Sequence, residues 1–390
     1  MKACLSIEEF NQLYHGKQFS LKTMDGKACL NGQINWPLTY DKDMPIPIVI
    51  LCPGSGLHNR DYLIGESNTN NDFVFLALAQ ELLNSGIAVA RYDCRGVSSH
   101  RRDALLDEPE FILQKDLAYR ERFVDCDIRR TVTPQSQCDD IFTIYEYLLE
   151  NSKALGISEF ILLGHSEGGL NISRMISRYN VSPIGVLLIS PPILSMSDIM
   201  RWQLYERYIK WLKMIPHSGD VITFDDIKNG YGNSPQAFID NISKIIPYKG
   251  FWDYSDLDKF LKEGEANYKT QKSAAFSHSD EEPWPSGAPF TQYSYSWWKQ
   301  HFSDDNTPEF FNLKNTMFPV YIFLGDIDTQ LDNEKQYSFY TQNRYVFPNV
   351  KISLLKGVGH TLGLHALMGP VTDECMEEIV MSVLQIICPE

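Results

Sequence analysis

A short motif that follows an apolar run constrains this chain more than any other feature of its sequence. Residues 164–168 read Gly-His-Ser-Glu-Gly, a G-x-S-x-G pattern, and residues 160–163 read Phe-Ile-Leu-Leu. Apolar residues then recur at helical spacing, at Leu170, Ile172, Met175 and Ile176. An apolar strand that ends at a glycine, presents a serine on a tight turn and continues into a helix is a nucleophile elbow. The sequence therefore predicts that Ser166 lies on such a turn, with its hydroxyl raised above a sheet.

The small residues around Ser166 have a physical role in this prediction. A serine on such a turn adopts a strained backbone conformation, and only small neighbours allow the strand and the helix to pass closely on either side. The motif alone also occurs by chance in long chains, so the strand before it and the helix after it carry the argument. We expect the side chain of His165 to brace the turn rather than to take part in chemistry.

Six short apolar runs predict buried parallel strands. They are mostly free of polar alternation and bounded by Gly, Pro or Asp, and they occupy residues 46–52, 87–92, 160–164, 186–190, 320–324 and 351–355. Helical patterns at residues 72–84, 139–149 and 371–387 separate or follow them. Strands that alternate with helices indicate a doubly wound, mostly parallel sheet, an α/β fold. Such sheets carry their active sites at the carboxyl ends of the strands.

A long stretch near the middle of the chain interrupts this alternation. It runs from about residue 194 to residue 315 and contains six of the seven tryptophans. We interpret residues 196–314 as an aromatic-rich, mainly helical cap, or lid, inserted into a core formed by residues 1–195 and 315–390. Most of its aromatic side chains should form the core of the cap itself, and some should line the cleft, because ligand pockets are mostly apolar.

A second, charged stretch covers residues 98–133. It follows the strand that ends near Asp93, so we expect it above the sheet and close to the site. It carries six arginines: Arg101, Arg102, Arg120, Arg122, Arg129 and Arg130. These side chains could bind a carboxylate of the substrate or could merely solvate the rim of the cleft, and we favour the rim.

A serine hydroxyl becomes a nucleophile only when a base takes its proton, and the base needs an orienting carboxylate. The strand at residues 320–324 is followed by Gly-Asp-Ile-Asp at residues 325–328. We favour Asp328 as the orienting carboxylate, because the three-residue step past the glycine carries its side chain around the turn. Asp326 is the alternative.

The predicted base follows the next strand. Residues 357–360 read Gly-Val-Gly-His, in a loop after the strand at residues 351–355. A histidine among glycines in a loop is poorly explained as a core residue. The chain order Ser166, Asp328, His360 is the order that accompanies a nucleophile elbow. We therefore predict these three as the catalytic residues.

Acyl transfer also needs hydrogen-bond donors for the oxyanion. One predicted donor is the backbone N–H of Glu167, which directly follows the nucleophile. The other lies in the loop after the strand at residues 46–52, where residues 53–56 read Pro-Gly-Ser-Gly. We favour the Ser55 amide in this oxyanion loop, with Gly56 as the alternative.

Neither a cofactor nor a metal ion is predicted. The loop at residues 53–56 lacks the G-x-G-x-x-G fingerprint, because Asn59 stands at the third glycine position, and it lacks the Walker lysine. No pair of histidines with a carboxylate appears at the spacing of metal ligands. We expect amino-acid side chains and backbone amides alone to form the site.

Charge and cysteine content limit the partners and the compartment. The formal net charge at pH 7 is −15. Binding to a nucleic acid or to an anionic membrane surface requires a basic face, so we expect neither as a partner. No stretch approaches the roughly 20 apolar residues of a membrane span, and residues 1–14 lack the apolar segment of a signal peptide. Eight scattered cysteines without a C-x-x-C pair favour a reducing, cytoplasmic location. The oligomeric state is unknown at this stage.

The motifs together resemble those of the α/β-hydrolases, and within them the bacterial esterase and acyl-thioesterase-like branch. The resemblance covers roughly residues 45–195 and 315–390 and rests on the segments at residues 54–61, 91–97, 164–169, 325–328 and 359–360. It implies a serine hydrolase that cleaves a carboxylic ester or thioester through an acyl-enzyme. Ser166, Asp328 and His360 would form its catalytic triad.

The resemblance also implies roles for charged residues and shows two departures. Arg60 and Asp61 would form an ion pair that braces the oxyanion loop, and Asp93 and Arg95 would fix a turn. The charged segment at residues 98–133 is longer than the loop that this branch usually carries, and the cap is large. Both border the expected cleft, so they affect the prediction of the substrate and not the prediction of the triad.

Other functions remain open on the same fold. The main prediction is hydrolysis of a small-molecule ester or thioester with an apolar or aromatic group, which the aromatic cap favours. An acyltransferase would use an acceptor other than water. A peptidase of this type usually brings a second large domain, for which residues 1–45 are too few. A non-catalytic binding protein on this scaffold would typically have lost a member of the triad.

Overall fold

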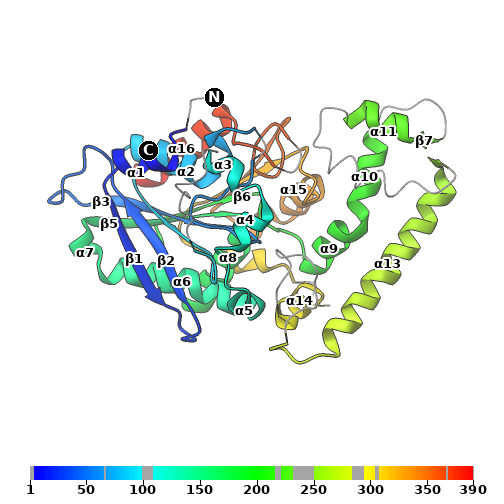
Figure 1. The fold of residues 1–390 in the computed structure, drawn as a ribbon, viewed down its shortest axis with the longest axis horizontal. Helices are drawn as coiled ribbons and strands as arrows, with labels where there is room; N and C mark the ends of the chain where they lie inside the picture. Colours follow the sequence, from blue (N-terminus) through cyan, green and yellow to red (C-terminus); the bar gives the residue numbers. More distant parts are fainter. Residues whose placement is uncertain are drawn as a thin grey trace.

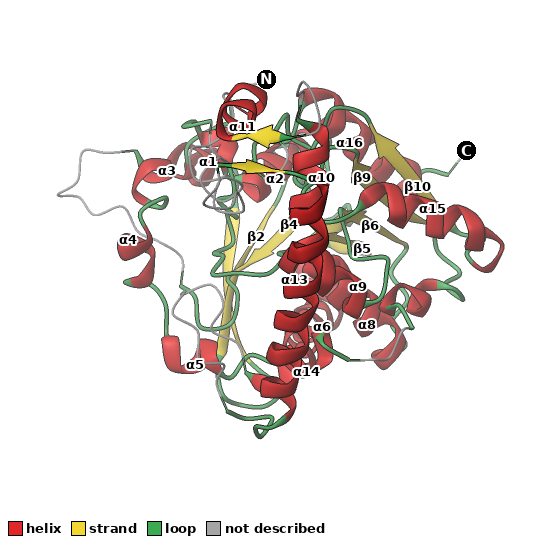
Figure 2. Ribbon diagram, turned by 90° about the vertical axis from the view of Figure 1, so that its right-hand side faces the viewer, coloured by secondary structure: helices red, strands yellow, loops and turns green. Residues whose placement is uncertain are grey.

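An eight-stranded sheet with helices on both faces forms the centre of the structure (Figures 1 and 2). The computed structural model describes residues 4–65, 67–98, 109–215, 221–231, 250–282, 294–303, 307–365 and 368–389. The strands lie in the order β1-β2-β4-β3-β5-β6-β9-β10. Their bounds are Gly16–Lys22 for β1, Cys29–Asn35 for β2, Ile46–Cys52 for β3, Ala88–Tyr92 for β4, Ile157–His165 for β5, Gly185–Ile189 for β6, Val320–Gly325 for β9 and Val350–Leu355 for β10.

The pairing of these strands confirms the predicted mostly parallel sheet. Strands β4, β3, β5, β6, β9 and β10 pair in parallel, and β1 and β2 join the sheet in antiparallel orientation. The six predicted runs correspond to the six parallel strands. The two antiparallel strands are absent from the sequence prediction. They lie at one edge and consist largely of polar residues, so they form no continuous apolar run.

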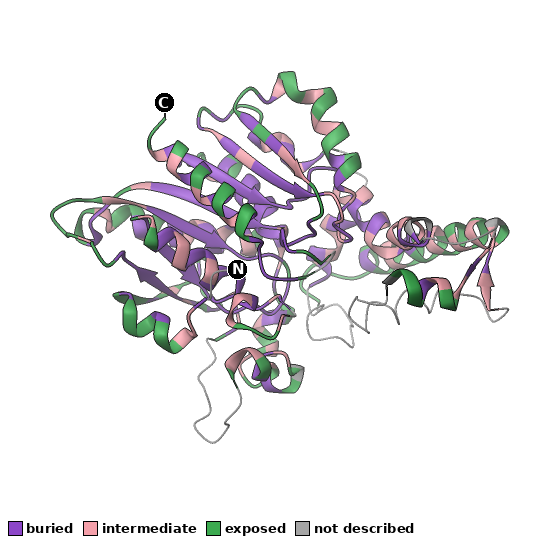
Figure 3. Ribbon diagram, turned by 90° about the horizontal axis from the view of Figure 1, so that it is seen from above, coloured by how far each residue is buried: buried purple, intermediate pink, exposed green. Residues whose placement is uncertain are grey.

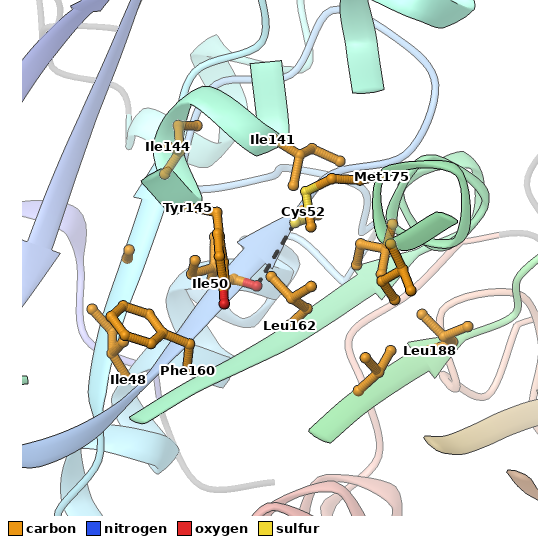
Figure 4. Packing of buried hydrophobic residues seen from close by; sticks show 14 of the residues in the cluster. Ile48, Ile50, Cys52, Ile141, Ile144, Tyr145, Phe160, Leu162, Met175 and Leu188 are labelled. Carbon is orange, nitrogen blue, oxygen red and sulfur yellow. Dashed lines mark hydrogen bonds between the residues drawn. The ribbon is translucent and has the colours of Figure 1, made fainter. Parts of the chain in front are cut away.

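Helices bury an apolar cluster on each face of the sheet. One cluster lies under α1 (Ile7–Leu13), α2 (Val74–Asn84) and α16 (Asp373–Ile387). The other lies under α6 (Pro134–Glu150), α8 (Glu167–Tyr179), α15 (Asn333–Asn343) and the short η4 (Glu309–Leu313). Figure 4 shows part of the second cluster, where Ile50, Leu162 and Leu188 of three adjacent strands meet side chains of α6 and α8. This two-sided burial explains why the central strands are apolar throughout.

Helix α6 begins at Pro134, earlier than the predicted residue 139. The side chain of Thr133 accepts a hydrogen bond from the Ser136 N–H, and the Ser136 side chain accepts one from the Thr133 N–H in return. A proline at the first helical position fits this start, because its missing N–H would have no partner there. The first turn is polar, so the apolar periodicity becomes visible only from Ile141.

Short helices complete the core. They are η1 (Asn70–Asp72), α3 (Glu110–Leu113), α4 (Leu117–Glu121), α5 (Cys126–Arg130), α7 (Ser152–Leu155) and η5 (Arg344–Val346). Helices α3 to α5 belong to the charged segment at residues 98–133. None of the helices in the described ranges combines the length and the apolar character that a membrane span requires.

Residues 196–314 lie between β6 and β9, and the described part of this range is mainly helical. Its elements are α9 (Met196–Arg201), a π-helical turn η2 (Trp202–Glu206), α10 (Arg207–Met214), β7 (Ile222–Thr223), α11 (Phe224–Tyr231), β8 (Phe251–Trp252), α13 (Tyr254–Phe276), α14 (Tyr295–His301) and η4, which packs on the core. Figures 1 and 3 show α10, α11 and α13 projecting beyond the sheet, whereas α9 and α14 lie close to it. We refer to these residues as the 196–314 segment.

Aromatic side chains of the 196–314 segment are buried mostly against one another. One cluster contains Trp211 and Trp252. A second cluster contains Tyr205, Tyr268, Tyr295 and Phe302. This agrees with the expectation that most of these aromatics form a core of their own; Trp284 lies outside the described residues.

Candidate active site

Ser166 lies at the turn between β5 and α8 in a backbone conformation that few residues adopt. Its φ is 52° and its ψ is −125°, in a region that costs a non-glycine residue on the order of 1–3 kcal/mol. Its N–H donates to the Ile189 carbonyl of β6 at 2.8 Å, so the neighbouring strand holds the turn. The Ser166 side chain makes no capping hydrogen bond to α8, which leaves the hydroxyl available to other partners.

Two glycines of the motif allow this turn. A methyl group on Gly164 would lie 2.7 Å from the backbone nitrogen of Gly169. A methyl group on Gly168 would lie 2.2 Å from the Cys52 carbonyl oxygen, at the end of β3. Both distances are too short for a real side chain, so the close approach of β5, α8 and β3 requires glycine at these positions.

His360 and Asp328 form a buried hydrogen-bonded pair next to this turn. Asp328 follows β9, His360 follows β10, and the distance between His360 Nδ1 and Asp328 Oδ2 is 2.8 Å. The exposed fraction is 7% for His360 and 2% for Asp328. The alternative carboxylate, Asp326, accepts instead from the Gly357 N–H at 2.7 Å and faces Lys356.

Hydrogen bonds from its own loop and from α15 hold the side chain of Asp328 in place. Oδ1 of Asp328 accepts from the N–H groups of Gln330 and Leu331, at 2.7 and 3.2 Å. Oδ2 accepts from Asn333 Nδ2 at 3.0 Å as well as from His360. These contacts fix the carboxyl group against His360 Nδ1, so Nε2 is the ring nitrogen that is left for other partners.

Asn333 is a site residue that the sequence reasoning missed. It lies at the start of α15, is 1% exposed, and also donates to the Gly325 carbonyl at 2.9 Å. Its side-chain oxygen accepts from Gln336 Nε2 at 2.7 Å. The only sequence signal for it is an asparagine five residues after Asp328, and this spacing matches no known motif for a residue that donates to the carboxylate.

The Ser166 hydroxyl and the His360 imidazole make no hydrogen bond with each other in this structure, in which both residues are described. Their loops are nevertheless adjacent, because the His165 ring lies 4.8 Å from the His360 ring, edge to face. Catalytic hydrogen bonds are often long in the absence of substrate and shorten when it binds.

The oxyanion loop lies directly against Ser166. A methyl group on Gly54 would come within 3.0 Å of the Ser166 Cβ and 3.1 Å of the His165 carbonyl oxygen. The next residue, Ser55, is exposed. Glu167 is the first residue of α8, where backbone N–H groups have no partner inside the helix and the helix dipole favours negative charge. The two predicted donors, Ser55 and Glu167, thus both neighbour Ser166.

Comparison with known proteins identifies the family of the chain. The sequence model of the Alpha/beta hydrolase family matches residues 49–367. The chain is a member of the α/β hydrolase family. This confirms the predicted superfamily and fold class. No curated protein shows significant sequence similarity to the chain.

Solved structures of similar fold include several hydrolases. A lipase in its open form has a TM-score of 0.50 at 14% identity, covering 96% of this chain and 98% of that chain. A carboxyl esterase from Bacillus coagulans, in complex with glycerol, has a TM-score of 0.49 at 14% identity, covering 95% and 99%. An esterase from Pyrococcus furiosus has a TM-score of 0.47 at 14% identity, covering 99% and 95%. At this level of identity the likeness concerns the fold alone.

In this α/β hydrolase, three side chains hold the three successive carbonyls of residues 55–57 in the oxyanion loop. His58 Nε2 donates to the first at 2.8 Å, Arg129 Nη2 to the second at 3.0 Å, and Arg120 Nη2 to the third at 2.5 Å. Burial, together with the nearby charge of Arg120, lowers the pKa of His58 to about 3, so its imidazole is neutral. Fixing the carbonyls of a short loop also fixes its amides, which is what an oxyanion site requires.

The expectation that the arginines of residues 98–133 solvate the rim is wrong for Arg120 and Arg129. Arg129 is 3% exposed, and Arg120 is partly buried. Their guanidinium groups satisfy loop carbonyls that would otherwise be buried without a partner. The exposed Arg122 and Arg130 fit the expectation, and Arg101 and Arg102 lie outside the described residues.

The predicted Arg60–Asp61 ion pair is also wrong. Arg60 pairs with Asp93 at 2.7 Å, and Asp61 pairs with Arg91. The reason is that β4 carries Arg91 and Asp93 to the loop after β3, where each meets the opposite charge. The Arg60 N–H also donates to Asp93 at 2.8 Å, so these buried pairs still brace the oxyanion loop, with other partners.

Arg95 fixes the turn after β4, as expected. Its guanidinium pairs with Asp140 of α6 at 2.6 Å and with Asp25 at 2.5 Å. Its carbonyl accepts from Arg129 Nη1 at 3.1 Å. The turn after β4, the start of α6 and the oxyanion loop are therefore connected through buried guanidinium groups.

The side chain of Glu167 connects the elbow to the 196–314 segment. Its buried carboxylate accepts from Trp297 Nε1 at 2.8 Å and from Gln137 Nε2 at 3.3 Å. Trp297 stacks on His301, with ring centroids 3.7 Å apart. Burial, and then the charge of Arg174, lowers the pKa of His301 to about 3. Helix α14 thus anchors on the residue that supplies a predicted oxyanion donor, through a contact that no sequence motif indicates.

A small cavity lies beside the oxyanion loop, and a larger groove lies away from it. A cavity of about 30 Å³ lies beside the oxyanion loop, lined by Gly54, Arg129, Gln137 and Asn171 among others; it is large enough for about one water molecule. A larger groove of about 370 Å³ lies between α2 and α16 and contains none of the site residues. In the described ranges, no group of three His, Cys, Asp or Glu side chains is arranged to hold a metal ion.

Proposed function

We propose that this α/β hydrolase is a serine hydrolase that cleaves a small-molecule carboxylic ester or thioester through an acyl-enzyme. The observation that carries the proposal is the buried pair of His360 and Asp328, 2.8 Å apart, beside a serine in a strained turn. A surface serine has no need of an imidazole that is oriented by a buried carboxylate. Nucleophilic catalysis by serine needs such a base, and a strained turn is typical of a nucleophile elbow.

The first half of the proposed reaction forms the acyl-enzyme. Ser166 Oγ attacks the carbonyl carbon of the substrate while its proton passes to His360 Nε2. Asp328 stabilises the imidazolium that results, and hydrogen bonds from Gln330, Leu331 and Asn333 keep its side chain in position. The backbone amides of Ser55 and Glu167 donate to the oxyanion of the tetrahedral intermediate.

The second half releases both products. The proton on His360 passes to the departing alcohol or thiol as its bond to the carbonyl carbon breaks, and the acyl group stays on Ser166. Water then attacks the acyl carbon and gives a proton to His360. The second tetrahedral intermediate collapses to a free acid, and Ser166 regains its proton.

The substrate is proposed to carry an apolar or aromatic group. The support is that the 196–314 segment reaches the elbow through Trp297 and contributes aromatic side chains near it. The proposal includes a cytoplasmic location, for which the eight cysteines, all of them free, are the support.

Labelling with a fluorophosphonate tests the proposed nucleophile. The expected result is a covalent adduct on Ser166, found by mass spectrometry, and no adduct in Ser166→Ala. Ser173→Ala is the matched control, because Ser173 lies on the same helix and its hydroxyl donates to the Gly169 carbonyl. Absence of labelling in the folded wild-type protein would overturn the proposal.

A substrate panel then defines the reaction. p-Nitrophenyl esters of increasing chain length, acyl-CoA thioesters and amides are compared, with Ser166→Ala as the blank. Hydrolysis of esters or thioesters but not amides is the expected result. Adding a competing alcohol separates hydrolysis from acyl transfer, since an acyltransferase would form mainly the new ester even in dilute alcohol.

A further inference from the structure

Three loops of the site meet at the side chain of His165. Its Nδ1 lies 2.7 Å from the Tyr62 hydroxyl, and its Nε2 lies 3.1 Å from the carbonyl oxygen of His360. The Tyr62 hydroxyl in turn accepts from the Gly54 N–H at 2.9 Å. One chain of hydrogen bonds therefore runs from the oxyanion loop, through the residue before the nucleophile, to the backbone of the base.

The donors and acceptors of this chain fix one tautomer of His165. A carbonyl oxygen can only accept, so the hydrogen bond to His360 places a proton on His165 Nε2. A neutral imidazole with its proton on Nε2 can only accept at Nδ1, so the Tyr62 hydroxyl donates to His165 Nδ1.

Burial favours the same neutral form. His165 is 3% exposed and Tyr62 is 2% exposed. Burial, with a smaller effect of the neighbouring His360, lowers the pKa of His165 well below 6.5. The Tyr62 ring is enclosed between Phe75 at 4.3 Å and His58 at 4.4 Å, measured between ring centroids.

The three loops that meet at His165 each contain a residue with a strained backbone. Tyr62 has a φ of 60°, Ser166 has a φ of 52°, and Leu362, in the loop after His360, has a φ of 60°. Non-glycine residues keep such conformations only where the surrounding structure holds them. The hydrogen bonds of Tyr62 and His165 connect these three strained loops to one another.

We propose that His165 is a positioning residue that, together with Tyr62, sets the distance between the oxyanion loop, Ser166 and His360. His165 touches no reacting atom. Its ring contacts the carbonyl of His360 on one side and, through the Tyr62 hydroxyl, the oxyanion loop on the other. The catalytic consequence rests on the proposed function, whereas the tautomer and the hydrogen bonds do not.

The sharpest test removes a single atom, the Tyr62 hydroxyl oxygen. Tyr62→Phe keeps the ring and its packing but deletes the bonds to Gly54 and His165. Because small displacements of catalytic groups lower the rate strongly, we expect kcat to fall about ten- to a hundredfold. KM should change less than about threefold, since no substrate contact is removed, and the rate of fluorophosphonate labelling should fall together with kcat.

Control variants separate positioning from a general loss of stability. Tyr340→Phe removes a hydroxyl that donates to the Val350 carbonyl, between α15 and β10 and away from the site; it should leave kcat unchanged. His165→Gln can still donate to the His360 carbonyl, so it should lose less kcat than His165→Leu. Wild-type kcat in Tyr62→Phe, or equal losses in the two His165 variants at equal Tm, would overturn the proposal.

NMR of protein labelled with 15N-histidine gives a readout that does not depend on activity. His165, assigned by its absence from His165→Gln, should appear as the neutral tautomer with its proton on Nε2 from pH 6 to pH 8. The His360 signals should shift in Tyr62→Phe but not in Tyr340→Phe. If the wild-type protein neither labels nor turns over ester, the proposed function fails, and these spectra still decide the positioning role. A proton on Nδ1 of His165, or unshifted His360 signals, would refute it.

Discussion

At the scale of single residues, the surroundings of Asp328 differ from those of Asp326 although the two carboxylates are two positions apart. Asp328 accepts four hydrogen bonds and faces His360, whereas Asp326 faces Gly357 and Lys356 at the surface. The side chains turn in different directions from one loop. Their chemistry is therefore set by the turn after β9 rather than by residue type.

This difference predicts opposite effects of two identical substitutions. Asp328→Asn keeps the size of the side chain but removes the charge that stabilises the imidazolium, so kcat should fall by about 10⁴-fold, as in other Ser-His-Asp sites. Asp326→Asn should keep kcat near the wild-type value. Steady-state kinetics with the best ester of the panel measure both. An active Asp328→Asn together with an inactive Asp326→Asn would reverse the assignment.

At the scale of elements, the short helices of residues 109–133 hold the oxyanion loop, and α14 holds the elbow. Arg129 of α5 donates to the Gly56 and Arg95 carbonyls, and Trp297 of α14 donates to Glu167. Contacts from elements outside the central sheet thus hold both predicted oxyanion donors in place. Stability and activity should change together when these contacts are removed.

The contacts of Arg129 lead to one such prediction. Arg129→Met keeps much of the apolar volume but leaves two carbonyls without their charged donor. Since hydrogen bonds to charged groups contribute about 1.5–3 kcal/mol each, the free energy of unfolding should fall by roughly 3 kcal/mol or more, and kcat should fall with it. Arg130→Met, at the exposed neighbouring position, should change stability by no more than about 0.5 kcal/mol. Urea unfolding and ester kinetics measure the pair.

Trp297 allows a matched test on the 196–314 segment. Trp297→Phe removes the N–H that donates to the buried Glu167 carboxylate, and a buried acceptor that loses its partner costs about 1–3 kcal/mol. We expect that loss in stability and a lower kcat. Trp252→Phe is the control, because Trp252 packs in the cluster with Trp211, to which no residue of the elbow belongs. Equal kcat values in the two variants would contradict a role for α14 at the site.

At the scale of the whole molecule, the direction of the parallel strands brings the residues of the candidate site together. The loops after β3, β5, β9 and β10 leave the same edge of the sheet, and they carry Ser55, Ser166, Asp328 and His360. Since this edge follows from strand direction, apolar runs and chain order suffice to predict which loops meet. That is why the sequence could predict that these four residues lie at one edge of the sheet, whereas their catalytic roles remain a proposal.

The rest of the site could not be predicted, for a physical reason. The partners of Arg60 and Asp61, the bonds of Arg129 and the contact between Trp297 and Glu167 depend on side chains that are far apart in sequence. Apolar periodicity gives no information about them. The antiparallel strands β1 and β2 are missed for a related reason, because polar residues and a glycine interrupt their apolar residues, so no apolar run marks them.

Buried neutral histidines make the stability of the whole molecule depend on pH. The pKa is lowered to about 3 for His58 and His301 and well below 6.5 for His165, in each case mainly by burial. The unfolded chain binds protons at these sites below pH 6.5 and the folded protein does not. Each histidine thus contributes stability that is fully present above pH 6.5 and is lost as the pH falls, at up to about 1.4 kcal/mol per pH unit.

A comparison of variants isolates one of these contributions. Between pH 6.5 and pH 5, the wild-type protein should lose roughly 2 kcal/mol more stability than His301→Gln, which cannot take up this proton. All other titrating groups cancel in the difference. Urea unfolding at several pH values measures it, and parallel curves for the two proteins would show that His301 is not buried in its neutral form.

The strained turn at Ser166 has a consequence for how this protein could be improved. A glycine at this position would adopt a φ of 52° freely, so Ser166→Gly should be more stable than the wild-type protein by about 1 kcal/mol, measured by urea unfolding. It should also be inactive. Selection for thermostability alone would therefore favour loss of the nucleophile, and a library screened for heat resistance needs a parallel screen for turnover.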